Sequence, residues 1–158
     1  MDKLMYPARK VMYFFLKRSF LKCQKDEIAE EFLKLLLKLM SLSFCLDKKL
    51  RKNIEGFRGV IQFRSRDNEI RVLAAFKNDK LDVKELKPAD KPRDEPNATV
   101  IFKDAEGLMN FLLPKGGQRD VLRSILNNEV VLDGNWNYIY RFGFIATHVQ
   151  LQAAKLVA

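Results

Sequence analysis

The chain has 158 residues, 47% of them hydrophobic and 31% charged, a composition that excludes a disordered polymer and a protein built mainly of membrane-spanning segments. The formal net charge is +9, and residues 1–22 hold six basic residues against a single acid. Such a segment favours an anionic surface, either phospholipid headgroups or nucleic acid. We expect no nucleic-acid partner, because helix-turn-helix, zinc-finger and aromatic-basic RNA-binding motifs are missing from the sequence.

The two cysteines and the short apolar runs indicate the cellular location of the protein. Cys23 and Cys45 are too few for a disulfide scaffold or a four-cysteine zinc site, and each falls on a predicted helix as a small hydrophobic residue. The uncharged run 11–16 is too short for a signal-peptide core, and the run 39–46 is far short of the roughly 20 residues that cross a membrane. The sequence therefore predicts a cytoplasmic protein, peripheral on a membrane wherever its basic segment touches one.

The first predicted helix begins at Pro7 and ends near Cys23. Its large apolar residues recur at helical spacing, and Lys10, Lys17 and Arg18 lie on the other side. A basic amphipathic helix with large aromatic residues is typical of a helix lying in a membrane interface, with these three residues in contact with the headgroups. The alternative is that the apolar stripe packs on the core of the domain.

The second predicted helix spans residues 26–44, and its start is favoured by Asp26 and Glu27. The expected apolar stripe is Ile28, Phe32, Leu35, Leu36, Leu39 and Met40. The charged segment 47–56 is either a linker or a short helix ending at Gly56. Residues 1–55 are thus predicted to form an N-terminal helical extension.

From Gly59 onward the apolar residues alternate with a period of two. Strands are predicted at 60–64, 70–77 and 81–86, joined by turns into an antiparallel meander. Three prolines exclude regular structure between residues 87 and 97. Residues 56–158 are therefore predicted to form the α+β part of the chain.

A strand, helix, helix and strand follow between residues 97 and 136. The strand 98–103 leads to a helix capped by Asp104, and a second helix stops at Asn127-Asn128 before the strand 130–132. Asn135 can then cap a last helix from 136 to about 155.

The sequence contains few candidate catalytic residues. His148 is the only histidine, so the chain alone cannot build a serine-type triad or a histidine-rich metal site. Asp104 is explained as a helix cap, and Glu106 two residues later points to another side of the helix. We expect a non-enzymatic protein without a metal or cofactor.

Four segments, in this order, resemble the sterol-carrier-protein-2-like family of lipid-binding domains. They are GVIQF at 59–63, IRVLAAFKNDKLDV at 70–83, ATVIFKDAEGLMNFLL at 98–113 and ILNNEVVLDGNW at 125–136. The resemblance implies a curved, mainly antiparallel five-stranded sheet covered by helices, around a hydrophobic tunnel. The implied lining residues are Val72, Ala74, Phe76, Val100, Phe102, Leu108, Leu112, Leu122, Ile125, Val130, Leu132, Trp136, Ile139 and Phe142.

Two functions remain open from the sequence. In the first, the protein binds or transfers a hydrophobic lipid (a sterol, a fatty acyl chain or an isoprenoid), and the basic N-terminal helix touches an anionic membrane. In the second, bulky residues such as Trp136, Tyr138 and Tyr140 fill the core. The protein would then be an interaction module that forms a homodimer or docks on an enzyme of a lipid or quinone pathway.

Overall fold

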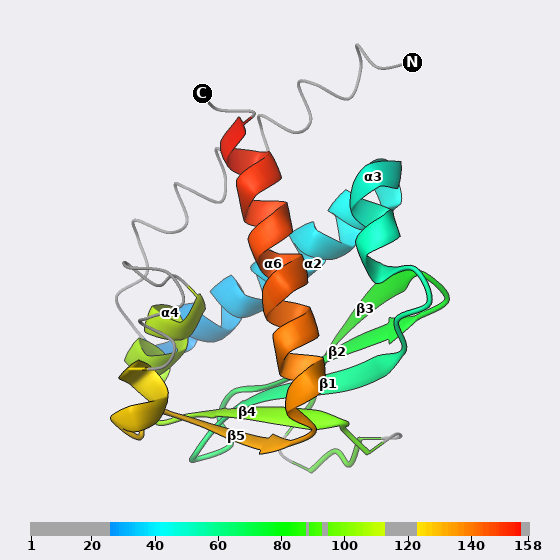
Figure 1. The fold of residues 1–158 in the computed structure, drawn as a ribbon. Coiled ribbons are helices and arrows are strands. Elements are labelled where there is room, and N and C mark those ends of the chain that lie inside the picture. Colours follow the sequence, from blue (N-terminus) through cyan, green and yellow to red (C-terminus); the bar gives the residue numbers. More distant parts are fainter. Residues whose placement is uncertain (1–25, 88, 93–94, 113–122, 156–158) are drawn as a thin grey trace.

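The structure is a computed structural model that describes residues 26–87, 89–92, 95–112 and 123–155. Five strands form one sheet in the order β3-β2-β1-β4-β5 (Figure 1). Their bounds are β1 (Gly59–Ser65), β2 (Arg71–Lys77), β3 (Lys80–Glu85), β4 (Ala98–Phe102) and β5 (Val130–Gly134). Neighbouring strands are antiparallel except β1 and β4, which are parallel. The predicted α+β class with a mainly antiparallel five-stranded sheet is confirmed.

Helices cover one face of this sheet, and α6 begins beside the end of β5 and rises steeply from the β4–β5 side (Figure 1). They are α2 (Asp26–Leu46), α3 (Lys48–Arg51), the 3-10 helix η1 (Lys52–Ile54), α4 (Ala105–Leu112) and α6 (Trp136–Lys155). Residues 123–126 are also helical. None of the helices within the described residues is long and apolar enough to cross a membrane.

Short polar side chains set several helix starts, and those at Asp104 and Asn135 are the ones that the sequence predicts. Asp104 Oδ1 accepts a hydrogen bond of 2.9 Å from Gly107 N, and Asn135 Oδ1 accepts one of 3.0 Å from Asn137 N. Asp47 caps α3 through Lys49 N at 2.8 Å. Each cap satisfies a backbone donor that the first helical turn leaves unpaired. The segment 47–56 is thus a short helix, one of its two predicted forms.

Turns between the strands use residues that tolerate positive φ. Asn78 and Asp79 have φ of 53° and 56°, and together they join β2 to β3. Left-handed conformations at both central positions match the twist of an antiparallel pair. Asn128, with φ of 56°, ends the helical residues 123–126 before β5. These asparagine and aspartate residues fix where the strands reverse.

The helix α2 packs into the same buried core as the sheet. Its buried large apolar residues are Phe32, Leu33, Leu37, Met40 and Phe44. The buried stripe of α2 therefore differs from the predicted one by a rotation of about one residue, since Leu35, Leu36 and Leu39 are only half-buried. The division at residues 55 and 56 stays a prediction, because shared packing does not reveal which part folds on its own.

Cys45 does not behave as the predicted small hydrophobic residue in the core, because it is exposed. The buried face of α2 passes through Phe44, and Cys45 is one residue off this face. Its carbonyl oxygen accepts a hydrogen bond of 2.6 Å from Arg51 Nη2, which helps to close the end of the helix. Cys23 lies outside the described residues, as does the predicted first helix with Lys10, Lys17 and Arg18.

Candidate functional site

The helix-covered face of the sheet is apolar across four strands. Phe63 on β1 lies opposite Val72 on β2 and Val100 on β4, and Val100 lies opposite Leu132 on β5. Directly paired residues place their side chains on the same face. Phe63, Val72 and Val100 are fully buried, whereas Leu132 at the β5 edge is half-buried. We call these side chains, with the helical side chains packed on them, the apolar layer.

Phe142 of α6 inserts into the centre of the apolar layer. Its ring centroid lies 5.2 Å from that of Phe63 and 6.4 Å from that of Phe76. Phe63 lies 6.4 Å from Phe102 in a near-parallel arrangement, and Phe102 meets Phe111 of α4 edge-on at 5.5 Å. Such tilted and offset pairs stabilise beyond the area they bury. The rings connect α4 to α6 across the sheet.

Phe57, just before β1, extends this aromatic contact to the far end of the sheet. Its ring centroid is 4.9 Å from that of Phe76 and 5.7 Å from that of Tyr138. The guanidinium carbon of Arg141 lies 5.6 Å from the Phe57 centroid, and Arg141 Nη2 donates to Asn53 O at 3.2 Å. Aromatic contacts and a cation–π contact thus tie α6 to Phe57, and the Arg141 hydrogen bond ties it to η1.

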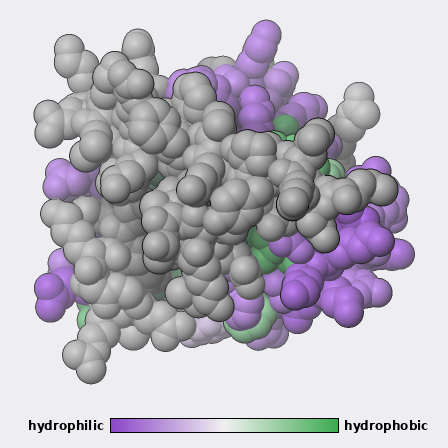
Figure 2. All heavy atoms as spheres, turned by 90° about the horizontal axis from the view of Figure 1, so that it is seen from above, coloured by the Kyte–Doolittle hydropathy of each residue, from purple (hydrophilic) through white to green (hydrophobic). Residues whose placement is uncertain are grey.

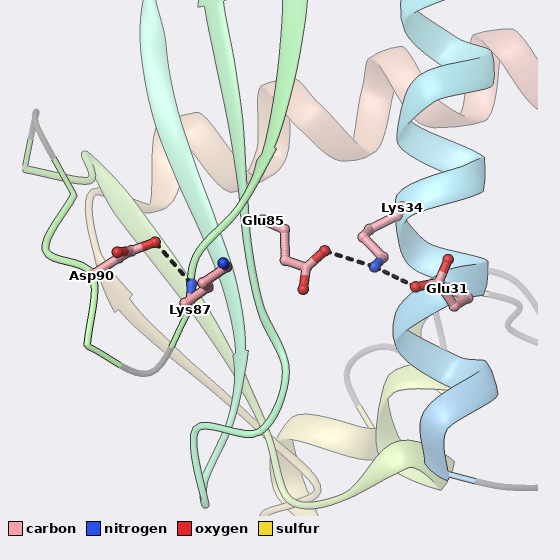
Figure 3. Close-up of polar contacts among 5 residues, drawn as sticks. All are labelled: Glu31, Lys34, Glu85, Lys87 and Asp90. Carbon is pink, nitrogen blue, oxygen red and sulfur yellow. Dashed lines mark hydrogen bonds and ion pairs between the residues drawn. The ribbon is translucent and has the colours of Figure 1, made fainter.

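At the β3 edge, α2 closes the apolar layer through polar contacts. Ser41 Oγ donates to Leu81 O at 2.5 Å, and Lys34 Nζ lies 2.8 Å from Glu85 Oε2. Lys34 also pairs with Glu31 one turn earlier in α2 (Figure 3). Burial alone would lower the pKa of Lys34, but its hydrogen bonds to Glu31 and Glu85 outweigh burial and raise it. The hydrogen bond from Lys34 lowers the pKa of Glu85.

Just beyond this ion pair, the chain leaves β3 through a short turn. Lys87 N donates to Asp90 Oδ2 at 3.1 Å (Figure 3). Leu86 N donates to Arg71 O at 2.8 Å, and the Leu86 side chain is buried. The β3 edge is therefore held on both sides of Glu85.

The β5 edge is different, because half-buried apolar side chains border the layer there. They are Phe111 of α4, Ile125 of the helical residues 123–126, Leu132 of β5 and Ile139 of α6. Leu126 and Val131 are exposed at 82% and 38%. No ion pair closes this edge among the described residues, in contrast with Lys34 and Glu85 at the other edge. Of the two edges, this is the one where apolar side chains approach the surface.

Most of the lining residues implied by the resemblance lie together in the apolar layer. Those fully or almost fully buried are Val72, Ala74, Phe76, Val100, Phe102, Leu108, Val130 and Phe142. Ile125, Leu132 and Ile139 are half-buried. Leu122 and the side chain of Leu112 lie outside the described residues.

Trp136 was expected to complete the lining, but its side chain is 46% exposed and it does not belong to the apolar layer. Its ring lies 6.4 Å from that of Tyr140 on the outer side of α6. The inner side of this helix carries Phe142 and Ile145, and the 100° step per residue places Trp136 well away from them. Trp136 therefore does not block the interior.

Several core residues were absent from the expected lining set. On β1 they are Ile61 and Phe63, and on α6 Ile145. The alternation in GVIQF carries the signal for the first two, since residues 61 and 63 share one face of a strand. The contribution of α2 to the core was harder to predict from the sequence, because helical spacing does not show which element an apolar stripe packs against.

Within the described residues, no three histidine, cysteine, aspartate or glutamate side chains gather as a metal site. His148 Nδ1 lies 3.2 Å from Phe144 O, and its ring is tilted against that of Phe144, with the centroids 4.3 Å apart. Every buried side-chain nitrogen or oxygen atom in the described part has a hydrogen-bond partner. The arrangement offers apolar contact and shape rather than reactive groups.

A surface hollow of about 140 Å³ lies at α3, apart from the apolar layer. It is lined by Lys48, Arg51, Lys52, Glu55 and Asp79. Sites for drug-sized ligands usually measure about 300 Å³ or more and are mostly apolar. This hollow is therefore too small and too charged to hold a lipid chain.

No family model and no curated protein sequence matches this chain. Several solved structures match it in fold. The UbiJ-SCP2 ubiquinone synthesis protein matches with a TM-score of 0.55 at 14% identity, over 82% of this chain and 98% of that one. Sterol carrier protein 2 from Yarrowia lipolytica, in its apo form, gives a TM-score of 0.56 at 13% identity, over 78% and 93%. The sterol carrier protein domain 2 of Helicoverpa armigera gives 0.51 at 18% identity, over 80% and 89%.

These matches agree in length as well as in shape, since each covers most of both chains. The protein has a sterol-carrier-protein-2-like fold, as the four sequence segments predict. At such low identities the likeness concerns the fold alone.

Proposed function

We propose that this protein binds a hydrophobic lipid between the sheet and the helices and carries it without chemical change. The observation that supports this most directly is the apolar layer in a sterol-carrier-protein-2-like fold. A sterol, a fatty acyl chain or an isoprenoid gains free energy there at about 25 cal/mol per Å² of apolar surface removed from water. Non-enzymatic binding is consistent with a layer formed by aliphatic and aromatic side chains.

The lipid would enter at the β5 edge, between α4 and α6. The β3 edge is held by Ser41 and Lys34, so separating α2 from β3 breaks a hydrogen bond and an ion pair. At the β5 edge, Ile125 and Leu132 are half-buried and make apolar contacts that a lipid chain can replace. Entry of the lipid at the β5 edge therefore costs less free energy than entry at the β3 edge.

The basic N-terminal segment would hold the protein on an anionic membrane while a lipid is exchanged. Lys10, Lys17 and Arg18 are the proposed headgroup contacts. This makes the protein peripheral on the cytoplasmic side of a membrane, with an anionic lipid surface as its partner.

Lipid extraction and native mass spectrometry of the purified full-length protein test the proposal. We expect a bound lipid and saturable binding of a fluorescent fatty acid or sterol. Ile125→Trp fills the β5 edge and should weaken this binding at least about tenfold by steric exclusion. Leu126→Trp is the matched control, because the next side chain is 82% exposed and its replacement should leave binding unchanged. Ligand-free protein that binds neither probe would overturn the proposal.

A second candidate function is an accessory module with a filled core. Phe63 and Phe102 are fully buried and already in contact, which favours a core occupied by its own side chains. One matching structure is titled a ubiquinone synthesis protein, and this favours docking on an enzyme of a quinone or lipid pathway. In that case the protein binds no lipid probe but forms a homodimer or a stable complex with an enzyme, which analytical ultracentrifugation and co-purification would detect.

A further inference from the structure

Three large aromatic side chains line the outer side of α6. Trp136, Tyr140 and Phe144 are exposed at 46%, 67% and 53%, and we call them the aromatic row. They follow one another at intervals of four residues, so they lie along one stripe of the helix. Phe142 and Ile145, which face the core, are buried on the other side. The aromatic row is thus a second apolar surface, separate from the apolar layer.

Exposure of this kind is unfavourable unless something covers it. Singly exposed apolar side chains are ordinary, but a contiguous apolar stripe marks an interaction surface. The Trp136 and Tyr140 ring centroids are 6.4 Å apart, and those of Phe144 and His148 are 4.3 Å apart with the rings tilted. Each ring of the row thus lies beside another ring of α6, and the three share one side of the helix.

The charges around the aromatic row indicate what covers it. The helix α6 carries Arg141 beside the row and contains no acidic residue. Arg141 is bonded to Asn53 O, so η1 lies beside α6. Lys48 and Lys49 of α3 and Lys52 of η1 are exposed, against one exposed acid, Glu55, in the same stretch. Figure 2 shows hydrophilic residues gathered on the right, the side where α3 and the β2–β3 turn lie in Figure 1. Basic residues therefore outnumber acidic ones on α6 and on the α3–η1 segment beside it.

We infer that the aromatic row inserts into the interface of an anionic phospholipid membrane, as a contact additional to the N-terminal segment. The inference rests on the proposed function and names which face of the lipid-binding domain meets the membrane. Trp and Tyr favour the headgroup level because their rings are apolar and their N–H or O–H groups are polar. Neighbouring cations gain from anionic headgroups within about a Debye length.

A second copy of the chain fits this surface less well. Pairing two aromatic rows about a two-fold axis would bring Arg141 and η1 of each copy near their counterparts. These segments carry the same sign of charge, and α6 offers no acid to compensate. An anionic lipid surface has the opposite charge and is electrically complementary.

Placement of the row at the membrane also fits the proposed route of the lipid. The helix α6 begins directly after β5, and Trp136 at its first turn follows the strand whose edge the lipid would cross. A membrane in contact with the row would therefore lie close to the β5 edge. The lipid would pass between membrane and apolar layer over a short distance.

Trp136 is the only tryptophan in the chain, so its fluorescence tests the inference directly. The full-length protein is mixed with vesicles of phosphatidylglycerol and phosphatidylcholine, or of phosphatidylcholine alone. We expect emission to move to shorter wavelength with the anionic vesicles, and brominated phospholipids to quench it. In parallel, vesicle sedimentation compares the wild type with Tyr140→Asn/Phe144→Asn, which should bind about tenfold more weakly because two aromatic side chains no longer insert.

Asn137→Ser is the matched control, since it alters an exposed polar side chain of the same helix and should leave sedimentation unchanged. Unaltered circular dichroism melting of the double variant would show that the fold is intact. Sedimentation with anionic vesicles but without any change in Trp136 emission would overturn the inference and leave the proposed function standing. An emission shift that grows with protein concentration in the absence of vesicles would instead assign the row to self-association. A shift produced by monomeric fatty acid alone would place Trp136 at the interior site, and each of these two outcomes also overturns the inference.

Discussion

The ring of Tyr138 lies directly over the backbone of Gly59. A Cβ atom added at residue 59 would lie 2.1 Å from Tyr138 Cε1, far inside a normal contact distance. Phe57 limits the retreat of the ring, because its centroid is 5.7 Å from that of Tyr138. A glycine at the first residue of β1 is what allows α6 to approach the sheet this closely.

Gly59→Ala should therefore destabilise the protein by about 1–3 kcal/mol through overpacking. Urea unfolding followed by circular dichroism measures the loss. Gly143→Ala is the control on the same helix as Tyr138, since no atom lies within 4 Å of a Cβ added there. Because it replaces an exposed helical glycine, it should stabilise the protein by about 0.5–1 kcal/mol. An alanine at residue 59 without any cost would show that Tyr138 moves freely.

The pair of Lys34 and Glu85 makes the stability depend on pH. Since the folded-state pKa of Glu85 is lowered, its contribution is present above the unfolded pKa of about 4.3 and is lost as the pH falls through the folded value. The folded-state pKa of Lys34 is raised, so its contribution is present below the unfolded pKa of about 10.4 and is lost at higher pH. Between these limits the pair contributes in full.

Glu85→Gln should lower the free energy of unfolding at pH 7 by less than about 1 kcal/mol, because the Glu85 side chain is 51% exposed and water screens the pair. The difference from the wild type should shrink toward zero as the pH falls through the lowered folded-state pKa of Glu85, because both proteins then lack the charge. Glu69→Gln replaces another exposed glutamate, away from Lys34, and serves as the control. A difference that stays constant from pH 7 to pH 3 would contradict the role of the ion pair.

Phe142 and Phe144 lie two residues apart on α6 but on different sides of it. Phe142→Ala removes a ring that contacts Phe63 and Phe76 and should cost about 3–5 kcal/mol. Phe144→Ala removes a ring that is 53% exposed and should cost about 0.5 kcal/mol or less. Chemical denaturation of both variants separates the apolar layer from the aromatic row. Equal losses would mean that Phe144 is also part of the core.

The local features of this fold could be predicted from the sequence because they depend on a few residues each. The cap at Asp104 and the turn at residues 77–80 follow from side chains that pair with nearby backbone or tolerate positive φ. Alternation placed Val72, Ala74 and Phe76 on one face of a strand, and the structure has them on the buried face. The parallel pairing of β1 with β4 was not predicted, because it joins residues 37 positions apart and leaves no local pattern.

The rotation of the helices was the harder part of the site. Leu35, Leu36 and Leu37 are consecutive, so helical spacing allows several stripes, and contact with the sheet selects the one through Leu37. Trp136 shows the same ambiguity, since the resemblance implied a place in the lining but the turn of the helix puts it outside. Apolar periodicity indicates that a helix is amphipathic, and tertiary packing decides which edge of a broad apolar side is buried.

The basic N-terminal segment should supply most of the electrostatic attraction to a membrane, separately from the aromatic row. A triple variant with Lys10, Lys17 and Arg18 changed to Glu loses contributions of about 1 kcal/mol each near an anionic surface. Affinity for phosphatidylglycerol vesicles should therefore fall by roughly 100-fold at low salt and by less at high salt, where screening already weakens the wild type. Sedimentation at two salt concentrations measures both effects.

The control changes Lys77, Lys80 and Lys84 to Glu, so that it has the same net charge as the triple variant. These three lysines are exposed on the β2–β3 hairpin. If the control loses as much affinity as the triple variant, net charge alone drives binding and the N-terminal segment has no special role. If neither loses affinity, the attraction is not electrostatic. A loss confined to the N-terminal variant, with Trp136 emission still shifted at high vesicle concentration, would assign charge attraction to the segment and insertion to α6.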